Sequence, residues 1–292
     1  MKRCRVIGTA TSTVLSALAT DVGAQPIPPA PGSTAGATQK TVSIPGATVF
    51  VTGANRGIGL GIVKVLLERD VRKVYATSRR PESLSEIVDS GAGRVIPIQL
   101  DVNDAEQRTK AAAAATDATW LINNAGVPGS DIGVERRIRA ASSLADARFV
   151  METNCWSVAE LSRLFIPTIL ANGGGAIVNV LSVGAWYCVP AHTTYSMSKA
   201  AAAIMTAGLR AELDREPVLV AGVFTGSVST RMSGERGMDP IDHAAEVFDA
   251  LARGETDILA GAGSARLRDE VRADPKAVER DRTERFYANL PS

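Results

Sequence analysis

Tyr195 and Lys199, in the segment Thr-Thr-Tyr-Ser-Met-Ser-Lys, are spaced to act together. Four residues make about one helical turn, so on a helix both side chains project from the same face. An ammonium beside a phenol stabilises the phenolate, and we therefore expect Lys199 to lower the pKa of Tyr195. A tyrosine tuned in this way can act as a general acid near neutral pH. The spacing also arises by chance on exposed helices, so its meaning depends on the residues around it.

A glycine-rich turn near the start of the chain has the composition of a dinucleotide-binding loop. The segment Val-Thr-Gly-Ala-Asn-Arg-Gly-Ile-Gly ends at residue 59, follows a predicted strand and opens a predicted helix. Glycines let the backbone approach a pyrophosphate, whose charge then lies at the helix N-terminus. The residues expected to contact the cofactor here are Gly53, Asn55, Arg56, Gly57, Ile58 and Gly59.

The position about twenty residues further on discriminates between cofactors. An Asp or Glu there binds a ribose 2′-hydroxyl, whereas this chain has Ser78-Arg79-Arg80. A carboxylate would repel a 2′-phosphate, while an arginine pairs with it through charge-assisted hydrogen bonds. Arg56 can approach the same phosphate. Ser78 and Arg79 therefore predict NADP(H) rather than NAD(H); the alternative is two solvated arginines after a strand.

Short apolar runs alternate with helical patterns along most of the chain. Strands are predicted at 47–52, 73–77, 94–100, 119–123, 176–181, 219–224 and 258–260, and helices at 57–69, 81–90, 104–116, 147–171, 193–214 and 242–253. The strands are continuous apolar runs, which is typical of a parallel sheet covered on both faces. Repeated βα units predict one α/β domain over residues 42–292, a Rossmann-like, doubly wound parallel sheet in a three-layer αβα arrangement.

Polar residues follow the ends of several predicted strands. Asp101-Val102 follows the third strand, Asn-Asn-Ala-Gly at 123–126 the fourth, Ser182 the fifth and Thr225 the sixth. Ligands bind at this edge of an open α/β sheet. Because Ser182 lies thirteen residues before Tyr195, we expect the helix that carries Tyr195 to start close to it.

Composition excludes several classes of protein. The 292 residues are 45% hydrophobic and 22% charged, with a formal net charge of +1, so neither nucleic acid nor a membrane surface is implied as a partner. The cysteines (Cys4, Cys155 and Cys188) suggest neither a disulfide framework nor a metal site, which suits a reducing, cytoplasmic location. No run of apolar residues is long enough to span a membrane.

Residues 1–41 differ from the remainder. A basic start (Met1-Lys2-Arg3) precedes a mildly apolar stretch and then a segment rich in Pro, Gly, Ala, Thr and Ser. We expect a disordered extension or one that stems from an upstream start codon. The alternative is a poor signal peptide cleaved after Ala24, which would allow export.

Taken jointly, the motifs resemble those of the short-chain dehydrogenase/reductase family, over about Val49 to Ala260. They agree with that family in order and spacing: Thr-Gly-x-x-x-Gly-Ile-Gly at 52–59, Asn-Asn-Ala-Gly at 123–126, Asn154, Ser182 and Tyr-x-x-x-Lys at 195–199. The resemblance implies an NADP(H)-dependent oxidoreductase that interconverts a carbonyl and an alcohol by hydride transfer.

The resemblance also implies a role for each site residue. Tyr195 would exchange a proton with the carbonyl oxygen, and Ser182 would hydrogen-bond that oxygen. Lys199 would bind the nicotinamide ribose and tune Tyr195, while Asn154 would hold a water that relays protons through Lys199. Asp101 would meet the adenine amino group. The cofactor contacts added by resemblance are Asp101, Val102, Asn123, Ala125, Gly126, Tyr195, Lys199, Val228 and Thr230.

The loop after the sixth strand departs from the family pattern, because Thr225 stands where the family usually has proline. Loss of the fixed φ of proline should loosen this loop slightly. We expect His192 to form a loop or cap contact or to meet substrate, and His243 to be exposed. By resemblance, Trp186, Tyr187 and Met232 would face the cleft. The same resemblance predicts a homodimer or homotetramer through the long helices.

Two other functions stay open at this point. An epimerase or dehydratase could use the same scaffold, although the chain is short after the sixth strand. A redox sensor could bind NADP(H) without turnover, although it would have no need of Tyr195. The sequence does not identify the substrate.

Overall fold

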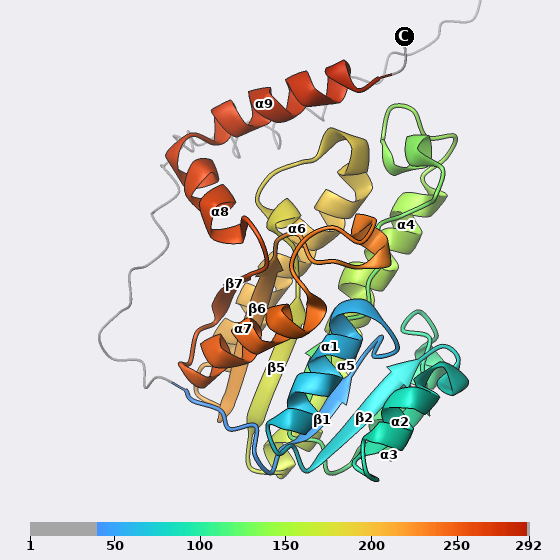
Figure 1. Cartoon of the computed structure of the whole chain (residues 1–292), viewed down its shortest axis with the longest axis vertical. Helices are drawn as coiled ribbons and strands as arrows, with labels where there is room; N and C mark the ends of the chain where they lie inside the picture. Colours follow the sequence, from blue (N-terminus) through green and yellow to red (C-terminus); the bar gives the residue numbers. More distant parts are fainter. Residues whose placement is uncertain (1–39, 291–292) are drawn as a thin grey trace, which may run out of the picture. The chain divides into compact units, whose positions relative to one another are not determined.

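The computed structural model describes residues 40–290, which contain a single parallel sheet (Figure 1). Its strands are β1 (Thr48–Val51), β2 (Lys73–Ser78), β3 (Val95–Gln99), β4 (Trp120–Asn123), β5 (Gly175–Val180), β6 (Val218–Thr225) and β7 (Asp257–Ala260). The strand order is β3-β2-β1-β4-β5-β6-β7, so β1 and β4 are neighbours and the winding direction reverses between them. This is the predicted doubly wound α/β fold.

The strands form because their residues are buried on both faces. All four residues of β1 and all eight of β6 are buried. One side of the sheet packs on the apolar faces of α1 (Gly57–Glu68), α2 (Ser85–Ser90) and α7 (Pro240–Ala252). The other side packs on α3 (Ala105–Ala114), α5 (Ser157–Ala171) and α6 (Thr193–Glu212). Two apolar layers therefore enclose the sheet, as expected for three layers.

Two predicted helices differ from those observed. The predicted helix 81–90 is a 3₁₀ turn, Pro81–Leu84, followed by α2. The predicted helix 147–171 begins earlier, as α4 (Ala145–Met151), and is interrupted by a π-helical turn, Glu152–Trp156, before α5 starts. Apolar periodicity extends across the turn and does not reveal it. Such turns insert one residue into a helix and recur at functional sites.

Two further helices, α8 (Ser264–Ala273) and α9 (Pro275–Ala288), had no counterpart in the sequence prediction. Both are highly charged, and α9 lacks an apolar stripe, so hydrophobic periodicity gives no signal for it, whereas α8 has a short amphipathic pattern around the buried Leu267 that sequence reasoning overlooked. The start of α9 nevertheless has a readable signal, because Asp274 accepts from the Ala277 N–H and Pro275 follows at the first helical position. The Arg282 guanidinium of α9 stacks 5.1 Å from the Tyr187 ring centroid, beyond the carboxyl end of β5.

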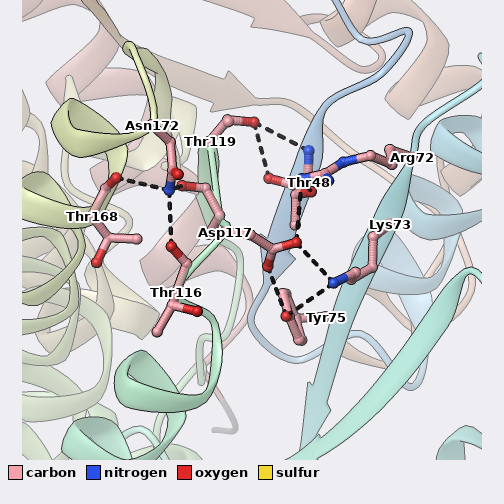
Figure 2. Close-up of polar contacts among 10 residues, drawn as sticks. Thr48, Arg72, Lys73, Tyr75, Thr116, Asp117, Thr119, Thr168 and Asn172 are labelled. Carbon is pink, nitrogen blue, oxygen red and sulfur yellow. Dashed lines mark hydrogen bonds and ion pairs between the residues drawn. The ribbon is translucent and has the colours of Figure 1, made fainter.

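The amino-terminal edge of the sheet holds a dense polar cluster (Figure 2). The Asp117 carboxylate accepts hydrogen bonds from Lys73 Nζ at 2.8 Å, from the Tyr75 hydroxyl at 2.8 Å and from Arg72 Nη2 at 3.2 Å. Burial alone would raise the pKa of Asp117, but the bonds from Lys73 and Tyr75 outweigh it and leave the pKa below its ordinary value. We call Arg72, Lys73, Tyr75 and Asp117 the Asp117 cluster.

The prediction for residues 1–41 falls outside the described residues except for Lys40 and Thr41. Lys40 Nζ donates to the carbonyls of Leu213 at 2.7 Å and Val218 at 3.2 Å. The compact unit that contains the sheet starts at Lys40.

Candidate active site

A cavity of about 650 Å³ lies at the carboxyl ends of the strands. The loops that follow β1 to β6 all contribute to its wall, so the cavity spans the point where the winding reverses. Ligands bind at that point in open α/β sheets. Most of the residues that the sequence assigned to a cofactor or to catalysis line this cavity: Gly53, Asn55, Arg56, Gly57, Ile58, Gly59, Ser78, Arg79, Asp101, Val102, Ala125, Gly126, Ser182, Tyr195, Lys199, Val228 and Thr230.

The glycine turn after β1 is locked in place by the loop after β4. A Cβ at Gly59 would collide with the Gly53 carbonyl and lie 2.5 Å from Asn124 Nδ2. Asn124 Nδ2 donates to the carbonyls of Thr52 at 2.9 Å and Gly53 at 3.1 Å. The first turn of α1 starts at Gly57 with no side-chain cap, which leaves its N–H groups for a ligand. The turn therefore fits a phosphate group.

Three guanidinium groups gather at the end of the cavity next to β2. Arg56, Arg79 and Arg80 are exposed and line it. Within residues 40–290 none of the three forms an ion pair. Ser78 shapes the turn, because its hydroxyl donates to the Arg80 carbonyl at 2.6 Å and accepts from the Arg80 N–H at 3.2 Å. Asp101 lines the cavity nearby. This end therefore presents unpaired positive charge to a ligand.

Ser182, Tyr195 and Lys199 meet at the other end of the cavity. Ser182 follows β5 and accepts from the Gly184 N–H at 3.0 Å, and Tyr195 lies in the first turn of α6. Lys199 is 5% exposed, and its Nζ donates to the Val180 carbonyl at 2.8 Å. Nζ lies 5.9 Å from the centroid of the Tyr195 ring. The predicted one-turn spacing thus places both groups on the cavity wall.

Burial dominates the titration of both residues. It lowers the pKa of Lys199 to about 8 and raises the pKa of Tyr195, while a hydrogen bond with Ser182 acts on Tyr195 in the opposite direction. The expected net fall of the tyrosine pKa is therefore wrong for this structure, because burial outweighs any neighbouring charge. Lys199 Nζ is bonded to Val180, and no hydrogen bond joins it to the phenol.

Asn154 lies in the π-helical turn behind the cavity wall and does not line it. Its Oδ1 accepts from the Val127 N–H, and its Nδ2 donates to the Val127 carbonyl and the Ser198 hydroxyl, all at 2.9 Å. The Ser198 hydroxyl donates to the Tyr195 carbonyl at 2.7 Å. Asn154 therefore joins the loop after β4 to the helix that carries Tyr195. Its predicted role in a proton relay stays a prediction.

Asn123 also lies away from the cavity, contrary to the cofactor contact predicted for it. It is buried, and its Nδ2 donates to Asn179 Oδ1 at 2.9 Å and to the Ser162 hydroxyl at 3.3 Å. The neighbouring Asn124 lines the cavity instead. Successive residues of a strand point to opposite faces, so the choice between two adjacent asparagines depends on where the strand ends.

The loop after β6 is tied down more firmly than expected. The Thr225 hydroxyl lies 3.3 Å from His243 Nε2, and Thr230 caps a 3₁₀ turn through a reciprocal pair of bonds with Ser233. His243 is 1% exposed, and burial lowers its pKa to about 4, so the prediction of an exposed histidine is wrong. Val228 pairs with Met238 across the loop. These bonds replace the restraint that proline would give.

The end of the cavity that holds Ser182 and Tyr195 is partly aromatic. Tyr187 and Met232 line it as expected, whereas Trp186 stacks on Phe224 with ring centroids 4.5 Å apart and does not line the cavity. His192 also lines it, and further lining residues that sequence reasoning missed are Arg136, Phe149 and Val189. The sequence named His192 only as a candidate, and Arg136 lies in no recognisable motif.

Neither a metal centre nor a membrane span emerges from the described part of the chain. In residues 40–290 no three His, Cys, Asp or Glu side chains are grouped as metal ligands. No helix there combines the length and apolar character that crossing a bilayer requires.

Comparison with known proteins shows the family. The model of the family described as short chain dehydrogenase matches residues 47–240. The ketoacyl reductase HetN of Nostoc sp. is 32% identical over 194 residues, which cover 64% of this chain and 65% of that protein. A probable NADP-dependent dehydrogenase of Haemophilus influenzae is 31% identical over 208 residues, 69% of this chain and 80% of that protein. The chain thus spans just under two thirds of the first relative's length.

A comparison with solved structures points to the same family. A short-chain dehydrogenase from Burkholderia cenocepacia, solved in complex with NADP, is 37% identical with a TM-score of 0.75, and the match covers 82% of this chain and 98% of that one. The chain therefore belongs to the short-chain dehydrogenase/reductase family of oxidoreductases.

Proposed function

We propose that the protein is an NADP(H)-dependent reductase that interconverts a carbonyl and an alcohol. One observation carries the proposal. A single cavity is lined by the glycine turn, by the three arginines near β2 and by Ser182, Tyr195 and Lys199. The first group suits a phosphorylated dinucleotide and the second suits proton transfer to a carbonyl oxygen.

The residues at the arginine end fit NADP(H). Arg79 follows β2 where a carboxylate would favour NAD(H), and Arg56 and Arg80 add charge without a protein partner among the described residues. The uncapped first turn of α1 would hold the pyrophosphate, and Asp101 would face the adenine. The NADP in the Burkholderia structure and the name of the Haemophilus relative support this choice.

The chain's own groups would supply the acid. The phenol of Tyr195, whose pKa burial raises, would donate the proton to the carbonyl oxygen. The Ser182 hydroxyl would hold the carbonyl oxygen beside that phenol. Lys199, a cation below about pH 8, would stabilise the phenolate after the proton has left. NADPH, when bound, supplies the hydride that the protein cannot.

Tyr195→Phe tests the proposal. We expect the rate of NADPH oxidation with a panel of ketones, aldehydes and quinones to fall by about 10³-fold, because the acid is lost, while NADPH binding persists. Tyr187→Phe is the matched control, since it removes another cavity phenol and should change the rate by less than about threefold. A sensor would keep its function in Tyr195→Phe. Full turnover in Tyr195→Phe would contradict the proposal. So would a wild-type protein that oxidises NADPH with none of these compounds.

The assembly and the location remain parts of this proposal. Trp156 and Ile204, at the π-helical turn and on α6, are 58% and 77% exposed, and a homodimer through these helices would cover them. Ile204→Glu should then shift the mass measured by light scattering to that of a monomer; a monomeric wild-type protein would contradict the dimer. A cytoplasmic location stays a prediction.

A further inference from the structure

Arg136 places a guanidinium in the wall of the cavity on the substrate side. It ends a 3₁₀ turn, Gly133–Arg136, in the loop after β4, and its side chain is only 17% exposed. Arg136 and His192 line the same cavity as Ser182 and Tyr195. No step of the proposed reaction uses Arg136.

The donors of Arg136 are only partly satisfied by protein. Its Nε donates to the Ser130 carbonyl, and its Nη1 donates to His192 Nδ1 at 3.4 Å. Its Nη2 lies 3.9 Å from Asp131 Oδ1, beyond hydrogen-bond distance, and that carboxylate is fully exposed to competing water. A guanidinium has five N–H donors, so three lack an acceptor among the described residues.

Asp146 and Glu135 are further carboxylates close to this segment, and that of Glu135 accepts from the Ser142 N–H at 3.2 Å. The carboxylate of Asp146 is turned toward Ser130. Its Oδ1 accepts from the Ser130 N–H at 2.7 Å, and neither of its oxygens comes within ion-pair distance of Arg136. Asp146 Oδ2 is buried without a hydrogen-bond partner yet forms no ion pair with Arg136, so within the described residues Arg136 pairs only with the exposed Asp131, at 3.9 Å. A largely buried charge whose ion pair is long and open to water is costly, which makes purely structural use of Arg136 a poor explanation.

His192 adds a neutral donor next to this charge. A guanidinium can only donate, so His192 Nδ1 is the acceptor and the neutral ring carries its proton on Nε2. Burial lowers the pKa of His192, and the charge of Arg136 lowers it further, which keeps the ring neutral at pH 7. The pair thus combines one positive charge with N–H donors on the wall of the cavity that holds the acid.

We infer that the substrate carries, besides its carbonyl, an anionic oxygen group such as a carboxylate or phosphate, which Arg136 and His192 bind. Such groups accept two parallel hydrogen bonds from a guanidinium. This inference rests on the proposed function, because it describes the substrate of the same site.

The test compares charged and uncharged versions of one substrate. NADPH oxidation would be measured with oxo acids, with their methyl esters and with phosphorylated ketones. We expect kcat/KM to be about 10- to 100-fold higher for one anionic series than for the esters. Whichever series is preferred distinguishes carboxylate from phosphate. Preference for the esters would overturn the inference while leaving a carbonyl reductase intact.

Variants assign that preference to Arg136. Arg136→Gln should remove the preference for the anion and change kcat/KM for the ester by less than about threefold, whereas Arg136→Lys should retain part of it. Arg137→Gln is the matched control, because Arg137 is the adjacent arginine and packs over Phe286, 5.7 Å from its ring centroid. An equal preference in Arg136→Gln and wild type, or loss of the preference in Arg137→Gln, would contradict the inference.

A binding measurement separates this inference from the proposed reaction. Calorimetry with the protein saturated by NADPH would titrate saturated carboxylates, alkyl phosphates and the matching amides, none of which can be reduced. Anion binding that is lost in Arg136→Gln supports the inference even if no carbonyl compound is reduced. If neither anion binds more tightly than the amides, the inference fails even if turnover of neutral ketones is found.

Discussion

The two edges of the sheet use charge in opposite ways. At the amino-terminal edge, the Asp117 carboxylate meets Lys73, Tyr75 and Arg72 within 3.2 Å, so the charges there are matched by opposite charges (Figure 2). At the carboxyl-terminal edge, Lys199 is buried against a neutral carbonyl. Unpaired charge at one edge and paired charge at the other indicates that the first serves ligands and the second serves the fold.

The largest effect should come from Lys199→Met, which removes the buried charge at the active edge. We expect turnover to fall by about 10³-fold, because the phenolate of Tyr195 loses its cation. Stability should rise by about 1–2 kcal/mol, because burial of an ammonium without an acidic partner is costly. Denaturant unfolding and NADPH oxidation measure the two effects. If Lys199→Met unfolds at a lower denaturant concentration than wild type, the buried charge of Lys199 does not destabilise the fold, and the contrast drawn between the two edges is wrong.

Arg79→Asp should have the next largest effect, on the choice of cofactor. Replacing the cation by an acid should lower the ratio of kcat/KM for NADPH to that for NADH by roughly 100-fold, because a charged contact becomes a repulsion. Steady-state kinetics with both cofactors measure the ratio. Arg215→Asp makes the same charge change away from the cavity and should leave the ratio unchanged. An unchanged ratio in Arg79→Asp would contradict the cofactor assignment.

Asp117→Asn tests the paired edge. We expect a loss of about 2 kcal/mol of stability and unchanged kcat, because the charge-assisted bonds to Lys73 and Tyr75 are weakened far from the cavity. Asp89→Asn, at an exposed acid of α2, should change stability by less than about 0.5 kcal/mol. Equal stability of the two variants would show that the Asp117 cluster contributes nothing to the fold.

The same cluster predicts a pH dependence of stability. Because the folded-state pKa of Asp117 is lowered, its contribution is present above its unfolded pKa and is lost as the pH falls through the folded value. The difference in unfolding free energy between wild type and Asp117→Asn should therefore shrink below about pH 4. A difference that stays constant down to about pH 2 would contradict this account.

The last prediction concerns the pH profile of the reaction near neutral pH, where the effect is smallest. Lys199 has a pKa of about 8, so its charge is lost as the pH rises through that value. We expect kcat for carbonyl reduction to decline above this pH by up to about tenfold for each pH unit. The check is a profile from pH 6 to about 10 at saturating NADPH and substrate. A flat profile would show that the charge of Lys199 is not needed.

The parts of the site that follow local rules could be predicted from the sequence. The glycine turn and the pair Tyr195 and Lys199 depend on spacing within one turn or helix, and the parallel sheet follows from continuous apolar strands. The burial of His243 could not be predicted, because it depends on α7 packing between α1 and β7 and on the contact of His243 with Thr225. Arg136 could not be recognised either, since its position depends on where an irregular loop folds back to His192.

The choice between Asn123 and Asn124, and the tuning of Tyr195, failed for related reasons. The first depends on the residue at which β4 ends, and boundaries are the least certain part of a sequence prediction. The second depends on the balance between burial and a neighbouring charge, which spacing alone does not give.

The π-helical turn at Glu152–Trp156 makes chain length, as well as residue type, a constraint on the site. Deleting one residue there would restore the regular α-helical hydrogen-bond pattern and remove the widened turn that places Asn154 between Val127 and Ser198. The bonds through which Asn154 joins the loop after β4 to α6 would then be lost. Relatives that keep this site should therefore tolerate substitutions within the turn far better than a one-residue gap.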